Sequence, residues 1–125
     1  MCQFTLLDLP THRDERGMLT VIDKVKASLP FTVERMYWIY GSDHQTRGGH
    51  RHHVTRQALI AVHGSVDVYM YNGIEEERIT LANPQQCLLV EPQDWHQMHF
   101  GSDAVLLVLA SAPYDQLDYI NEPYV

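Results

Sequence analysis

Short segments of β-type residues, separated by turn residues roughly every eight to twelve positions, are the feature that most limits how this chain can fold. In segment 31–40, Arg35, Tyr37 and Ile39 fall on one face and the residues between them on the other, which is the period-two pattern of a strand. Further runs of strand length predict strands at 57–62, 66–71, 87–90 and 105–110. Because no long helical period is present, we expect an all-β antiparallel sandwich or barrel.

Turn residues predict how some of these strands connect. The sequence His63-Gly64-Ser65 is expected to join strands 57–62 and 66–71 as a hairpin. The dipeptide Asn72-Gly73 marks a second turn, followed by an acidic run at 75–77 that we interpret as the solvated edge of a strand. Near the two ends, segment 114–119 predicts a helical turn, and segment 4–9 is apolar enough to pair with another sheet.

Length and charge exclude several classes of function. A chain of 125 residues corresponds to a single domain over 1–125. The net charge of −7 argues against a general nucleic-acid binder, although a local pocket for a small anion remains compatible with it. No apolar stretch is long enough to span a membrane, so no membrane partner is expected. Two cysteines that need not pair and no export signal predict a cytoplasmic protein.

Histidine is the residue type whose distribution points to chemistry. The chain has eight, and six of them form two groups: His50, His52 and His53, with His44 upstream, and the pair at 96 and 99. On an extended strand His50 and His52 share a face while His53 points away. The two groups are candidates for one site if the fold brings them together.

The spacing around these histidines resembles the first motif of the cupin superfamily. It reads His50-x-His52, then four residues, Gln57, six residues and Gly64, with Gln57 where cupins have glutamate. The segment 92–97 resembles the second cupin motif, with Gln97 at the place of its histidine. The resemblance implies a cupin fold, a double-stranded β-helix or jelly roll.

The departures from the cupin motifs bear on metal binding. Metal-binding cupins hold a first-row ion with three imidazoles and one carboxylate, whereas Gln57 removes the carboxylate and the third histidine is displaced to His96. A shift by one residue on a strand is expected to turn the side chain to the opposite face. We therefore expect no metal and no cofactor. His96 or His99 could still complete a site through an irregular backbone.

A closer resemblance within the cupins covers nearly the whole chain. It is carried by the segments 14–17 (DERG), 35–40 (RMYWIY), 47–52 (RGGHRH), 92–96 (PQDWH), 106–111 (LLVLAS), 114–115 and 118–120. These segments are similar to those of the nucleotide-sugar 3,4-ketoisomerases. The resemblance implies that the substrate is dTDP-4-keto-6-deoxy-D-glucose, that its keto group moves from C4 to C3, that no metal takes part, and that the protein is a homodimer with an exchanged N-terminal strand. The product would feed the biosynthesis of 3-amino-3,6-dideoxyhexoses, sugars of O-antigen and lipopolysaccharide.

The chemistry of this reaction suits the residues at hand. A base must remove the C3 proton, an enediolate forms, and a proton is delivered to C4. A neutral imidazole fits the role of base at pH 7. We assign the C3 base to His50 and give His52 the task of orienting the sugar or shuttling protons, although the sequence allows the reverse. Tyr37 is a candidate to donate to the developing oxyanion.

Five further residues are candidates for binding the substrate. Arg47 lies beside the histidine motif and Arg16 follows an acidic turn, so either can hold a phosphate or a sugar hydroxyl. Gln57, Trp95 and His96 are expected around the sugar. The pairing of Arg16 with His96 resembles the branch of the family that forms the galacto-type product, with an axial C4 hydroxyl.

Three other functions remain open at this point. A 3,5-epimerase of a dTDP-4-keto-6-deoxy sugar uses the same α-proton chemistry but carries glutamine where this chain has His52. A metal-dependent cupin dioxygenase would need a metal ion in the site. A sugar-sensing cupin would bind the ligand without turnover.

Overall fold

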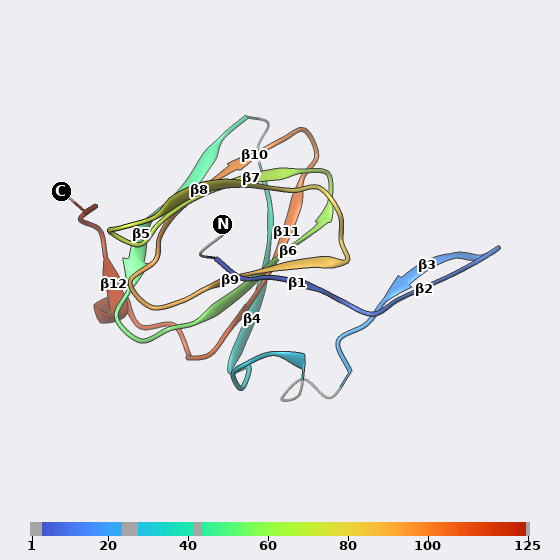
Figure 1. Cartoon of the computed structure of the whole chain (residues 1–125), viewed down its shortest axis with the longest axis horizontal. Helices are drawn as coiled ribbons and strands as arrows, with labels where there is room; N and C mark the ends of the chain where they lie inside the picture. Colours follow the sequence, from blue (N-terminus) through green and yellow to red (C-terminus); the bar gives the residue numbers. More distant parts are fainter. Residues whose placement is uncertain (1–3, 24–27, 42–43, 125) are drawn as a thin grey trace.

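The computed structural model describes residues 4–23, 28–41 and 44–124, which fold mainly into two facing antiparallel sheets (Figure 1). The first sheet has the order β1-β9-β6-β11-β4, formed by Leu6–Asp8, Gln86–Val90, Gln57–His63, Val105–Ala110 and Arg35–Tyr40. The second has the order β12-β5-β10-β7-β8, formed by Tyr119–Ile120, Thr46–His52, Trp95–Phe100, Val66–Tyr71 and Glu76–Leu81. The all-β jelly-roll prediction is confirmed.

A separate two-stranded hairpin extends away from these sheets (Figure 1). Its strands are β2 (Thr11–Asp14) and β3 (Gly17–Thr20), and most of their residues are exposed. One short 3-10 helix, η1 (Gln116–Asp118), precedes β12 and confirms the predicted turn near the C-terminal end. Among the described residues there is no helix of the length and apolarity that a membrane crossing would require.

The core lies between the two sheets because alternate side chains of their strands point toward each other. Val68, Leu88, Phe100 and Leu106 are completely buried there. A smaller apolar cluster covers the outer face of the first sheet, where Leu29 packs. The central strands β6, β9 and β11 are therefore apolar on both faces, which is why they read as continuous hydrophobic runs.

The predicted strand 31–40 begins only at Arg35. Phe31 and Val33 pack against the outer cluster instead of entering the ladder, so the first part of the prediction is wrong. From Arg35 onward the alternation holds, since Met36 and Trp38 are exposed while Tyr37 packs against the core.

The predicted hairpin between 57–62 and 66–71 is also wrong. Strand β6 pairs with β9 and β11, while β7 pairs with β8 and β10, so the chain crosses from one sheet to the other at Gly64. Gly64 has a φ of +69°, and a Cβ there would lie 2.9 Å from the Ala104 backbone, so the crossing needs glycine. In contrast, the turn at Asn72-Gly73 does join β7 to β8 as predicted, with the acidic run beginning the edge strand β8.

Candidate active site

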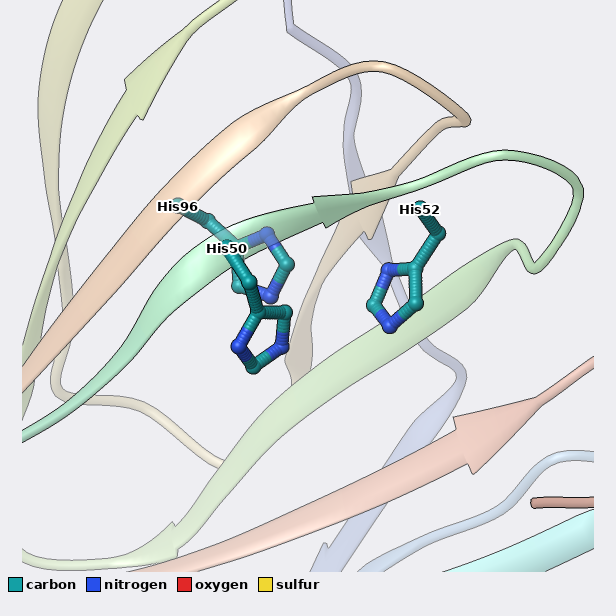
Figure 2. Close-up of side chains that lie close together, drawn as sticks. All are labelled: His50, His52 and His96. Atoms are coloured by element: carbon teal, nitrogen blue, oxygen red, sulfur yellow. The ribbon is translucent and has the colours of Figure 1, made fainter. Parts of the chain in front are cut away.

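Two neighbouring strands of the second sheet bring three histidines together. His50 and His52 lie on β5, and His96 lies on β10 directly opposite His50. Figure 2 shows the three rings gathered in one place, with those of His50 and His52 coming from the same strand. The prediction that His50 and His52 share a face is confirmed, and His53 is exposed as expected.

The expectation that the displaced His96 turns away from this face is wrong. On β10, His96, Met98 and Phe100 form the inward set, whereas Gln97 and His99 are exposed. The one-residue displacement therefore places a histidine inside and a glutamine outside. His96 completes the group that the sequence left open, and His99 does not, because its ring contacts Thr46 instead.

An irregularity in the ladder places Arg47 on the same inner surface. The register shifts where His96 pairs with His50 and Gln97 with Gly48, so Gly49 is the extra residue. Gly48 has a φ of +88°, and a Cβ there would approach the His96 carbonyl oxygen to 2.9 Å. This glycine bulge allows Arg47 and His50 to face the same cavity although they are three residues apart.

The three rings are close, and those of His52 and His96 are buried while His50 is half-buried. The ring centroids of His50 and His52 are 5.1 Å apart, and those of His50 and His96 are 4.8 Å apart. His52 is 0% exposed and His96 is 1% exposed. Neither ring nitrogen of His52 has a hydrogen-bond partner among the described residues, so its capacity to donate and accept is unused.

Burial keeps these imidazoles neutral. It lowers the pKa of His96 to about 3 and that of His52 to about 4, and it also lowers the pKa of His50. The Nδ1 of His96 lies 3.0 Å from the Asp94 carbonyl oxygen. A carbonyl only accepts, so Nδ1 donates, and the Nε2 of His96 carries a free lone pair. At neutral pH the site thus presents unprotonated bases.

His50 and His96 line a cavity of about 490 Å³ between the two sheets, whereas the fully buried His52 does not line it. It is lined by Arg35, Tyr37, Ile39, Arg47, Gly48, His50, Gln57, Leu59, His96, Met98, Val108, Tyr114 and Tyr119. Gln57 returns to the inner face as predicted, and its Nε2 donates to the Tyr37 hydroxyl at 3.2 Å. Burial raises the pKa of Tyr37, so its phenol is a proton donor at neutral pH.

Two predicted binding residues lie outside this cavity. Arg16 is in the turn of the β2–β3 hairpin, where its guanidinium pairs with Asp14 at 2.5 Å and borders a separate hollow. Trp95 is buried at the start of β10 but does not line the cavity. The described residues of one chain therefore bring together Tyr37, His50, His52 and His96, with Arg47 and Gln57.

The C-terminal segment supplies a residue that the sequence analysis missed. The ring of Tyr119 lies 4.7 Å from the rings of both His50 and His52, and β12 pairs with β5 at Tyr119 and His52. Just before it, the buried carboxylate of Asp118 accepts from the backbone of Val54 at 2.8 Å and from the Thr55 hydroxyl. These contacts hold the chain that follows His52, and no local pattern in the sequence predicts them, because they join positions more than 60 residues apart.

The three histidines are the group of described residues that could hold a metal ion, since one donor atom from each lies within 4.8 Å of the others. Three imidazoles do hold catalytic zinc in other proteins, so the donor set fits such an ion. The charges of the cavity favour an anion instead. Arg35 and Arg47 line it, and none of the described residues that line it is an aspartate or glutamate.

Comparison with known proteins places this site in a family. The family model described as "FdtA: WxcM-like, C-terminal" matches residues 2–124. A curated relative, the TDP-4-oxo-6-deoxy-alpha-D-glucose-3,4-oxoisomerase of Aneurinibacillus thermoaerophilus, is 40% identical over 111 residues, which is 87% of this chain and 79% of the relative.

Two solved structures show the same fold at substantial identity. The QdtA 3,4-ketoisomerase from Thermoanaerobacterium thermosaccharolyticum, a double mutant in complex with TDP, has a TM-score of 0.90 and 39% identity, covering 98% of this chain and 89% of its own. The WlaRB TDP-quinovose 3,4-ketoisomerase from Campylobacter jejuni has a TM-score of 0.88 and 35% identity, covering 98% and 95%. The chain therefore belongs to the FdtA-like family of cupin-fold 3,4-ketoisomerases.

Proposed function

We propose that this chain converts dTDP-4-keto-6-deoxy-D-glucose into dTDP-3-keto-6-deoxy-D-hexose. The observation that carries the proposal is the neutral His50, which lines one cavity with Tyr37 and has the neutral ring of His52 at 5.1 Å, in a chain 40% identical to a TDP-4-oxo-6-deoxyglucose 3,4-oxoisomerase. The product is of use to a 3-aminotransferase, which places the reaction before the formation of a 3-amino-3,6-dideoxyhexose. We expect the reaction to take place in the cytoplasm, in keeping with the free thiol of Cys87.

The proton transfers balance with the groups present. His50 takes the proton from C3, whose acidity comes from the neighbouring C4 carbonyl, and the electron pair moves to form the C3–C4 double bond of the enediolate. The proton of the O3 hydroxyl moves to O4, relayed by His52 or Tyr37. His50 then delivers its proton to C4, which leaves a ketone at C3. A positioned base of this kind contributes roughly 10²–10⁴-fold to the rate.

The remaining candidates hold the substrate. Arg47 is suited to a phosphate oxygen, because guanidinium binds phosphate bidentately and the cavity offers no competing carboxylate among its described residues. Gln57 orients the Tyr37 hydroxyl through their hydrogen bond. His96 borders the sugar from the strand opposite His50, and Trp95, outside the cavity, packs near Gly49 of the bulge.

A homodimer accounts for two features of the single chain: an exposed apolar surface and a hairpin that pairs with neither sheet. Strand β4 exposes Met36, Trp38 and Tyr40 beside an apolar hollow of about 410 Å³ on the outer face of the first sheet. An isolated two-stranded hairpin such as β2–β3 is marginally stable in water. We infer that a second copy covers both, with exchange of the N-terminal strand, and that the hairpin carries Arg16 to the partner's cavity.

Replacement of Trp38 by glutamate is expected to convert the dimer into monomers, because it puts a charge in the middle of the proposed interface. Light scattering at micromolar concentration should give twice the 14.5 kDa mass of one chain for the wild type and that mass once for the variant. Ile74→Glu is the matched control, since Ile74 is 87% exposed in the β7–β8 turn, and it should remain dimeric. A wild-type protein that is monomeric over this range would contradict the dimer.

The C4 hydroxyl of the product is expected to be axial, giving the galacto-type sugar. Support comes from the residue types of Arg16 and His96, whose pairing resembles the galacto-type branch of the family. Arginine and histidine are also the two residues introduced in the QdtA double mutant, in place of a tyrosine and an arginine. In the product trapped with a 3-aminotransferase, small vicinal couplings of the C4 proton should report the axial hydroxyl. Large diaxial couplings would remove the roles given to Arg16 and His96.

The same incubation in deuterated water tests the whole proposal. A ketoisomerase forms a 3-ketone that the aminotransferase consumes. Label at C3 and C5 with the 4-ketone retained would identify a 3,5-epimerase, and binding without turnover would identify a sugar-sensing protein. Either result would overturn the proposal.

Removal of metal ions is expected to leave the rate unchanged. The proposed steps use only imidazole, phenol and guanidinium groups, and Gln57 stands where a metal-binding cupin has its carboxylate ligand. The check is turnover after prolonged dialysis against EDTA, with metal content measured by elemental analysis. Loss of activity that one added metal restores would contradict this and favour a metal-dependent cupin.

A further inference from the structure

Arg35 carries a charge in the cavity that nothing in the described chain neutralises. Its Nε is buried without a hydrogen-bond partner. The ion pairs formed by the described residues are those of Arg16 with Asp14 and of Arg56 with Glu91, and neither involves Arg35. A buried guanidinium N–H without an acceptor is costly to the fold, which points to an anionic ligand at this nitrogen in the working enzyme.

The guanidinium of Arg35 is held in place by two aromatic rings. Its central carbon lies 5.3 Å from the ring centroid of Tyr37 and 5.7 Å from that of Tyr114. Arg35 and Tyr37 share the inner face of β4, and both line the cavity with His50. The charge is thus fixed beside the phenol at which the proposed reaction takes place.

We propose that Arg35 is a further catalytic residue, whose guanidinium donates to the sugar oxygen that becomes negative in the enediolate. This inference rests on the proposed 3,4-ketoisomerase reaction. When C3 loses its proton, negative charge develops on O4; the imidazolium formed at His50 must keep its proton for C4, and His52 and His96 are neutral. A permanent cation that is already oriented stabilises this oxyanion without reorganisation, and one such donor is worth roughly 10²–10³ in rate.

The diphosphate of the substrate is the other anion that Arg35 could hold. The position of Arg35 favours the oxyanion. Burial raises the pKa of Tyr37, and the charge of Arg35 opposes that rise more than the charge of Arg47 does. Burial also lowers the pKa of His52, and of these two arginines only Arg35 adds to that lowering. The guanidinium carbon of Arg35 also lies 5.3 Å from the ring centroid of Tyr37, beside the reacting phenol, which leaves Arg47 for the diphosphate.

The test separates binding of the diphosphate from catalysis. We would measure kcat with the 4-keto sugar nucleotide, and the Kd of TDP by calorimetry, for Arg35→Met, Arg35→Gln and, as the matched comparison, Arg47→Met. Methionine keeps the apolar stem between the two rings and removes the charge. Arg35→Met should lower kcat by about 10²–10³-fold with an unchanged Kd for TDP, whereas Arg47→Met should weaken TDP binding. Added guanidinium ion should partly restore kcat to Arg35→Met.

Each alternative has its own result. Weaker TDP binding by Arg35→Met with full kcat at saturation would assign Arg35 to the diphosphate. If neither the kcat nor the Kd of TDP changes, Arg35 is a packing residue. Either result overturns the proposal. If Arg35→Met does not fold, Arg35→Gln, which also removes the charge, decides: lower kcat with unchanged TDP affinity supports the proposal, and wild-type kcat overturns it. A wild-type enzyme without turnover would remove the proposed function and this inference together, whereas full activity in a folded Arg35→Met would remove only the inference.

Discussion

Replacement of His50 by asparagine is expected to abolish turnover while the fold is retained. His50 is the group assigned to the C3 proton, and an amide of similar size cannot accept a proton at neutral pH. Loss of the base alone should lower kcat by about 10²–10⁴-fold. Because the same group returns the proton to C4, we expect the upper end of that range. Turnover is measured by the coupled aminotransferase assay, and folding is checked by circular dichroism and thermal melting.

His53→Asn provides the matched control for this variant. His53 lies on the same stretch of chain but is exposed, so its replacement should leave the rate and the melting temperature unchanged. A His50→Asn protein that binds TDP and still turns over at close to the wild-type rate would remove His50 as the base. In that event His52→Asn should show the loss instead, since its ring lies 5.1 Å from that of His50 and is the other imidazole assigned to proton transfer.

The protein is expected to lose stability steeply as the pH falls from 6.5 to 4.5. Burial lowers the pKa of His96 to about 3 and of His52 to about 4. The unfolded chain binds protons at these residues near pH 6.5, whereas the folded chain does so only well below that pH. Their stabilisation is therefore complete above pH 6.5 and is lost as the pH falls toward the folded pKa values, by on the order of 5 kcal/mol for the two residues at pH 4.5.

Urea unfolding at a series of pH values and one fixed protein concentration measures this loss. The informative quantity is the slope of the unfolding free energy against pH. A substitution also changes the unfolding free energy by an amount that does not depend on pH, and this amount does not affect the slope. The slope should be shallower in His96→Gln than in the wild type, while exposed His53→Asn should keep the wild-type slope. Equal slopes in wild type and His96→Gln would show that His96 is not held neutral by the fold.

Four of the five strands that local sequence patterns predict with explicit bounds are correct to within one residue. Strands β7 and β11 have the predicted bounds, and β6 and β9 differ by one residue, because alternation and apolar runs reflect the local choice of which side chains are buried. Which strands pair with each other was harder to predict from the sequence. The sequence around Gly64 is typical of a hairpin turn, but the chain there crosses to the opposite sheet, and only the neighbours of β6 and β7 decide between these outcomes.

The sequence by itself determined the all-β class, the shared face of His50 and His52, the return of Gln57 to that face, and the family resemblance. These follow from residue type and a spacing of a few residues. Only the tertiary structure decided that His96 joins the histidines, that a glycine bulge turns Arg47 inward, and that Arg35 and Tyr119 lie in the same cavity. The physical reason is that register and bulges are set by contacts between strands far apart in the chain, and a shift of one residue exchanges the inner and outer faces.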